Sequence, residues 1–63
     1  MRVCDVPWKD LKVGDVVISA TGKSGKITDL RQQDDTICID WDNNQTSVAY
    51  HHQLDKVTFV KGD

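Results

Sequence analysis

The chain has 63 residues, of which 38% are hydrophobic and 29% are charged, and its formal net charge is −2. This length allows one small domain, which buries only about 60% of the surface that the unfolded chain exposes. The composition excludes a disordered or fibrous chain, and the negative balance excludes binding to a polyanion through net charge alone. All ten acidic residues are aspartates, which favour turns over helix interiors, so little helix is expected.

The distribution of apolar residues and cysteines predicts a cytoplasmic protein that does not enter a membrane. No apolar run has the length of a signal peptide or of a transmembrane span. Without a secretory signal, Cys4 and Cys38 are expected to remain free thiols. The sequence has no C-x-x-C motif, and the adjacent His51 and His52 lack a second pair of ligands. We therefore expect neither a metal site nor a cofactor.

The first predicted element is a hairpin that begins at residue 13. Residues 13–20 alternate in character and predict a strand, with three apolar residues of one parity on a common face. These residues are Val16, Ile18 and Ala20. Gly22 and Gly25 can both adopt positive φ, which allows the chain to reverse before a second strand over residues 26–31.

The second strand contains an irregularity, because its apolar residues Ile27 and Leu30 are three apart instead of two. This spacing predicts a β-bulge near Thr28 or Asp29. A polar turn over residues 32–35 follows.

The second half of the chain predicts a hairpin, a short turn and a last strand. Residues 36–41 alternate cleanly, with Ile37, Ile39 and Trp41 on one face. Residues 42–44 form a turn of Asp and Asn, and residues 45–50 return as the fourth strand. Residues 51–54 suit a 3₁₀ turn, and residues 56–60 form a fifth strand with Val57 and Phe59 alternating.

This succession of elements resembles the SH3-like barrel, and residues 13–30 resemble the KOW motif of some ribosomal proteins and transcription elongation factors. The KOW-like positions are Gly14 with Asp15, the alternating Val16 and Ile18, Gly22, Gly25 and Ile27. Residues 37–41 are similar to the strand that pairs back in Tudor-like and SH3-like barrels. The resemblance implies an all-β fold, a five-stranded SH3-like barrel with a short 3₁₀ turn before the last strand. We expect one domain over residues 1–63, with an ordered core over about residues 6–60.

A first functional hypothesis is a contact with nucleic acid or a ribonucleoprotein through residues 22–31 and the strand edge. Lys23, Lys26 and Arg31 would supply phosphate contacts, and the flexible glycines would let backbone N–H groups approach phosphate. The alternative role for these cations is to balance the neighbouring aspartates on a solvated surface.

A second functional hypothesis is a protein or peptide interaction module, which could assemble as a homo-oligomer. Trp8 and the turn residues Asn43, Asn44 and Gln45 are its candidate contacts. Trp8 either closes the open end of the barrel or forms part of a binding surface. The other three aromatic residues share parity with apolar residues and are expected in the core: Trp41, Tyr50 and Phe59. We expect a monomer in preference to a homodimer. A barrel that closes incompletely would nevertheless leave edge strands free to pair.

The third hypothesis is enzymatic and rests on similarity to the type II dihydrofolate reductases, which assemble such barrels around a pore. Gly14-Asp15, Ser24-Gly25 and Ser47-Val48 with Tyr50 resemble parts of that family's pattern. That family lines its pore with Val-Gln-Ile-Tyr, whereas this chain has Val48-Ala49-Tyr50. His51 and His52 are expected at the surface of their turn. The sequence therefore predicts a non-enzymatic binding module without catalytic residues.

Overall fold

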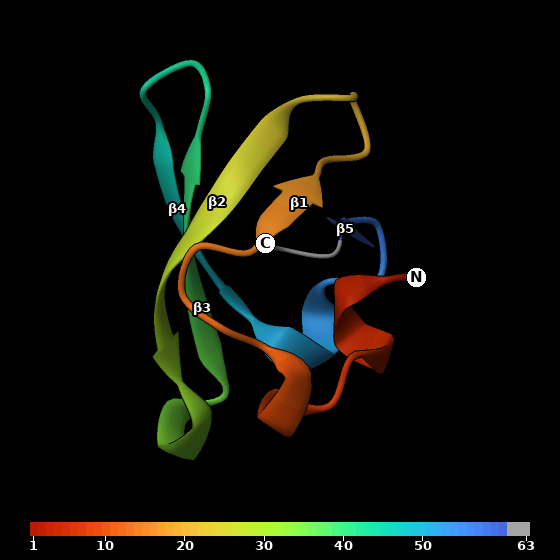
Figure 1. The fold of residues 1–63 in the computed structure, drawn as a ribbon, viewed down its shortest axis with the longest axis vertical. Helices are drawn as coiled ribbons and strands as arrows, with labels where there is room; N and C mark the ends of the chain where they lie inside the picture. Colours follow the sequence, from red (N-terminus) through yellow and green to blue (C-terminus); the bar gives the residue numbers. More distant parts are fainter. Residues whose placement is uncertain (61–63) are drawn as a thin grey trace.

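The computed structural model describes residues 1–60, which form one antiparallel sheet and several 3₁₀ turns (Figure 1). The strands are β1 (Val16–Ile18), β2 (Ser24–Arg31), β3 (Thr36–Trp41), β4 (Thr46–Tyr50) and β5 (Thr58–Val60). The 3₁₀ turns are η1 (Val3–Asp5), η2 (Trp8–Asp10), η3 (Gln32–Asp34) and η4 (His51–Gln53). The described residues contain no α-helix. The predictions of an all-β chain with five strands and a 3₁₀ turn before the last strand are confirmed.

The sheet has the strand order β4-β3-β2-β1-β5, so β4 and β5 are its two ends. Figure 1 shows that the sheet bends strongly along β2. Among the described residues, however, no strand pairing joins β4 to β5, and the sheet is therefore not closed into a barrel.

The β1–β2 hairpin and the β3–β4 hairpin use the same three-residue loop geometry. The loops cover residues 20–22 and 42–44, and their closing backbone hydrogen bonds measure 2.8 and 2.7 Å. The last loop residue is left-handed in each case, with φ of 88° at Gly22 and 65° at Asn44. A type I turn followed by one left-handed residue is a common way to join antiparallel strands. The turn predicted at residues 42–44 is thus confirmed.

The predicted β-bulge lies in the middle of β2. Ile27 pairs with Ile39 and Asp29 pairs with Cys38, so the register shifts between these two pairs. Thr28 is the extra residue, and its hydroxyl donates a hydrogen bond to the Cys38 carbonyl at 3.4 Å. The bulge keeps both Ile27 and Leu30 on the inner side of the sheet, which explains their spacing of three.

The first strand is shorter than expected, and the opposite parity faces the core. Val17 is fully buried, whereas Val16 and Ile18 are half-buried. The backbone N–H of Lys12 donates to the carboxylate of the buried Asp15 at 2.9 Å, which holds residues 12–15 in a turn. The strand therefore begins only at Val16, and the parity that carries Val16, Ile18 and Ala20 is not the buried one.

Gly25 serves packing and not chain reversal, contrary to expectation. It lies within β2 and pairs with Trp41 of β3. A Cβ atom at this position would lie 2.6 Å from Trp41 Cε3 and 2.8 Å from Ile39 Cγ2. Only glycine lets the indole ring lie this close to the β2 backbone.

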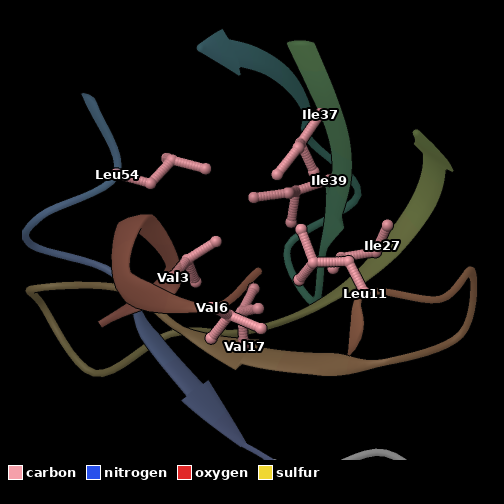
Figure 2. Close-up of a cluster of buried hydrophobic side chains, with 8 residues drawn as sticks. All are labelled: Val3, Val6, Leu11, Val17, Ile27, Ile37, Ile39 and Leu54. Carbon is pink, nitrogen blue, oxygen red and sulfur yellow. The ribbon is translucent and has the colours of Figure 1, made fainter. Parts of the chain in front are cut away.

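The hydrophobic core lies between the concave side of the sheet and the N-terminal segment. Figure 2 shows sheet residues such as Ile37 and Ile39 pointing toward Leu54, Val3 and Val6. The buried set comprises Val3, Val6, Leu11, Val17, Ile27, Ile37, Ile39 and Leu54. Val3 is 0% exposed, so the ordered core begins earlier than the expected residue 6. The last strand, β5, is described to Val60, the residue at which the predicted strand ends. Residues 61–63 lie outside the described part.

Candidate functional site

The two ends of the sheet differ in how their backbone groups are satisfied. At the β5 end, the N-terminal residues run alongside the strand, with a bridge between Arg2 and Thr58. The Phe59 N–H donates to the Met1 carbonyl at 2.6 Å, and the Val3 N–H donates to the Val57 carbonyl at 2.9 Å. The outer side of β5 is therefore covered by the chain itself.

The outer side of β4 has no such cover within residues 1–60. The Trp41 N–H donates to the Gln45 carbonyl at one end of the β3–β4 pair, and the His51 N–H donates to the Asp35 carbonyl at the other, both at 2.7 Å. Because antiparallel pairs alternate, Ser47 and Ala49 bond to β3, and every second residue directs its N–H and C=O away from β3. We call the backbone groups of these residues, Thr46, Val48 and Tyr50, the open edge.

The side chains of β4 do not protect this edge. The strand reads Thr-Ser-Val-Ala-Tyr and carries no charge, no proline and no bulge, which are the usual devices that prevent pairing at a strand edge. Val48 is 65% exposed and Tyr50 is 50% exposed. The edge therefore combines unpaired backbone groups with exposed apolar surface.

Tyr50 lies outside the core, contrary to prediction. Trp41 and Phe59, the other two residues predicted there, do pack against the core and are half-buried. On β4, Ala49 pairs with the buried Ile37, so the neighbouring Val48 and Tyr50 must point to the outer face. Tyr50 does share parity with an apolar residue, Val48, but that parity faces solvent.

A shallow groove of about 590 Å³ follows the outer face beside the open edge. It is lined by Arg31, Asp34, Thr36, Cys38, Val48 and Tyr50. The register explains this grouping, since Cys38 pairs with Val48 and Thr36 pairs with Tyr50. Cys38 thus lies on the outer face as its parity predicts, and both Cys4 and Cys38 are free in the structure.

Arg31, which lines this groove, forms an ion pair with Asp29. The Arg31 Nε donates to the Asp29 carboxylate at 3.0 Å, and both side chains are exposed. This hydrogen bond from Arg31 lowers the pKa of Asp29 below its ordinary value. An exposed ion pair of this kind contributes little stability, but it removes the free positive charge of Arg31 from the surface.

His51 is anchored at the end of β4 and is not a surface residue as expected. Its side chain is only 12% exposed. The Nε2 atom lies 2.8 Å from the Val6 carbonyl, and the ring lies 4.9 Å from the ring of Trp8. His51 therefore connects the end of the open-edge strand to the N-terminal segment.

The neighbouring His52 is exposed, as predicted for both histidines. Its ring stacks on Tyr50 at 5.7 Å, and its Nδ1 contacts the Asp35 carboxylate. The hydrogen bond with His52 lowers the pKa of Asp35. Asp35 is left-handed with φ of 57°, which directs its side chain from the end of η3 toward the histidines.

The structure separates the three basic residues that were predicted to contact phosphate. Lys23 lies in the β1–β2 loop, Lys26 lies opposite Asp40 on the outer face, and Arg31 pairs with an aspartate. Lys26 lies in the first half of β2 and Arg31 at its end, on the order of 15 Å apart at the strand rise of about 3.3 Å per residue. These cations form no continuous basic surface.

The residues predicted to contact a protein partner lie at opposite ends of the molecule (Figure 1). Trp8 opens η2 and is half-buried against the core and His51. The tip of the β3–β4 hairpin carries the exposed Asn43, Asn44 and Gln45. The Asn43 side-chain amide donates to the Gln45 side-chain oxygen at 3.1 Å, which holds the tip in one shape.

Within residues 1–60, no three His, Cys or Asp side chains are grouped in a way that could hold a metal ion. The helical segments in this part of the chain are too short and too polar to cross a membrane. No family model, no curated protein and no solved structure matches the chain.

Val48 and Tyr50 were not predicted as candidate contacts from the sequence, although a signal for them was present. The turn at residues 42–44 sets the register of the hairpin, and this register places Ala49 opposite Ile37. Since Ile37 faces the core, Ala49 must also face it, and Val48 and Tyr50 must face solvent.

Proposed function

We propose that this chain is a non-enzymatic protein-binding module that accepts an extended strand of a partner on the open edge of β4. The observation that carries the proposal is the contrast between the two ends of the sheet: β5 is covered by residues 1–3, whereas β4 presents unpaired backbone groups and an uncharged strand. Strand addition of this kind obtains affinity from main-chain hydrogen bonds and specificity from side-chain pockets.

We assign the fold to the SH3-like class. The strand order, the position of η4 before β5 and the bulged second strand support this assignment, and the resemblance of residues 13–30 to a KOW or Tudor-like first hairpin agrees with it. The open sheet leaves β4 accessible as an edge, which a closed barrel would not.

The groove beside the open edge suits the side chains of the added strand. Alternate residues of that strand would lie beside Val48 on the outer face, at the border of the groove, while its backbone bonds to β4. The groove is lined by the apolar Val48 and Tyr50 together with polar and charged residues, among them Arg31 and Asp34. We therefore expect a partner strand with one apolar residue flanked by neutral polar ones.

Nucleic-acid binding through residues 22–31 is the second candidate. Lys23 and Lys26 are both exposed, and no ion pair within the described residues engages either of them. The separation of the basic residues and the nearby Asp40 and Asp42 weaken this candidate, because phosphate binding depends on clustered positive charge.

Amide chemical-shift titration of the labelled protein separates the two candidates. Peptides selected on the chain from a library of short strand-forming sequences serve as one probe, and mixed RNA at low and physiological salt serves as the other. We expect peptide shifts at Thr46, Val48 and Tyr50 that change little with salt. The variant Val48→Lys should abolish them, and Val13→Lys is the control because Val13 is equally exposed, at 63%.

Two results would contradict the proposed function. Selected peptides that shift other regions and bind Val48→Lys normally would remove β4 from consideration. RNA shifts at Lys23 and Lys26 that disappear at physiological salt, without any peptide response, would favour the nucleic-acid candidate instead.

A further inference from the structure

The open edge of β4 is complementary to itself. An antiparallel pairing of two copies about a two-fold axis at Val48 places Val48 opposite Val48 of the second copy and Thr46 opposite its Tyr50. All three residues direct their N–H and C=O groups outward, so the two strands exchange about six hydrogen bonds and leave no unpaired group between them.

The charges around β4 also favour an antiparallel pairing of two copies. The strand itself is uncharged, so no like charges meet along it. The start of β4 follows the exposed acidic residue Asp42, whereas its end leads into the exposed His52. Antiparallel pairing keeps the exposed Asp42 residues of the two copies at opposite ends of the shared edge, whereas parallel pairing would place them side by side.

We propose that two copies of this chain pair along the open edge into a two-fold dimer in which the two sheets become continuous. This inference rests on the proposed function, since it names a second copy as the strand that occupies the edge. The outer faces then join as well, and Val48 and Tyr50 of each copy lose part of their exposure to water.

The dimer is expected to be weak. The interface is one strand wide, and such an area lies below the roughly 1,000 Å² of a stable protein–protein interface. The chain is therefore monomeric when dilute and dimeric when concentrated, and the dilute form keeps its edge available for another strand.

Sedimentation velocity of the full chain, from low micromolar to low millimolar concentration, tests this inference with charge-swapped variants. Val48→Lys places two lysines opposite each other at the axis, and Val48→Asp places two aspartates there, so each variant alone should associate at least tenfold more weakly than wild type. An equimolar mixture of the two should recover association, because lysine then faces aspartate. Val13→Lys is the matched control and should associate like wild type.

Several outcomes would overturn the dimer. These are a wild-type chain that stays monomeric throughout the range, a Val48→Lys variant that associates like wild type, and a mixture that fails to recover. The two proposals fail separately. A monomeric wild type whose β4 amides still respond to selected peptides overturns the dimer and supports the proposed function. Recovery in the mixture without any peptide response supports the dimer and overturns a foreign partner strand.

Discussion

The two ends of this sheet face the same physical problem and meet it differently. A strand at the end of a sheet presents a row of unpaired backbone groups that invites further pairing. At β5 the chain supplies its own cover, because Met1, Arg2 and Val3 run beside the strand and bond to it. At β4 the described residues supply none, and the strand carries no charge to repel a neighbour. The comparison shows that β5 is covered by the chain itself, whereas β4 is left open among the described residues, and this contrast is the basis of the proposed binding role.

The cover over β5 is held in place by the core. Val3 is fully buried and contributes to the same cluster as the strands, so the segment that satisfies the edge also closes the core. Beyond its pairing with β3, the end of β4 is joined to the N-terminal segment through the hydrogen bond between His51 and the Val6 carbonyl. Variants at Val3 and His51 test this difference. The segment that covers β5 belongs to the core, whereas the outer side of β4 has no cover within the described residues.

The largest effect is expected for Val3→Ala, which weakens the cover of β5. The change removes two buried methyl groups and leaves a cavity in a core of only eight residues, so we expect a loss of about 2 kcal/mol in the free energy of unfolding. Urea denaturation measures it. The control Val13→Ala alters an exposed valine and should stay within about 0.5 kcal/mol of wild type. Equal effects of the two variants would show that Val3 does not hold the cover.

The next effect is expected for His51→Ala, which releases the anchored end of β4. The Val6 carbonyl loses its partner and Trp8 loses its neighbouring ring, so the free energy of unfolding should fall by about 1–2 kcal/mol. The control is His52→Ala at the neighbouring exposed position. If His52→Ala destabilised the protein more than His51→Ala, the anchor would lie elsewhere.

Hydrogen exchange compares the two edges directly in the unmodified protein. The Phe59 amide is bonded to Met1, whereas the Val48 amide points away from β3. In dilute solution, where the proposed dimer is dissociated, Val48 should exchange at least about tenfold faster than its neighbour Ala49 and than Phe59. Strong protection of Val48 under these conditions would mean that the edge of β4 is already covered.

The smallest effect is expected for the pH dependence of stability that Asp35 contributes. Asp35 precedes β3 and contacts His52, just after the end of β4. The hydrogen bond with His52 lowers the pKa of Asp35 in the folded state below its ordinary value of 3.8. A lowered carboxyl pKa stabilises the fold at pH values above 3.8, and this contribution is lost as the pH falls through the folded pKa. Carboxyl NMR titration should show a higher pKa for Asp35 in His52→Ala, with Asp29 as an internal control whose pKa is unchanged. An unchanged pKa of Asp35 in His52→Ala would disprove the role of His52.

Local signals in the sequence determined the parts of this fold that depend on near neighbours. The alternation over Thr36–Trp41, the turn at residues 42–44, the bulge at Thr28 and the 3₁₀ turn at His51–Gln53 are all visible in short stretches of sequence. These features follow from backbone preferences and from side-chain periodicity, which act over a few residues.

Only the tertiary structure decided which faces and edges these elements present. Alternation defines two faces of a strand but does not say which one is inward, so Val17 and not Val16 meets the core, and Tyr50 points to solvent. The roles of Gly25, Val3 and His51 depend on partners far along the chain, namely Trp41, Val57 and Val6. The candidate site has the same origin, because an edge exists only once the strand order places β4 last and the N-terminus covers β5.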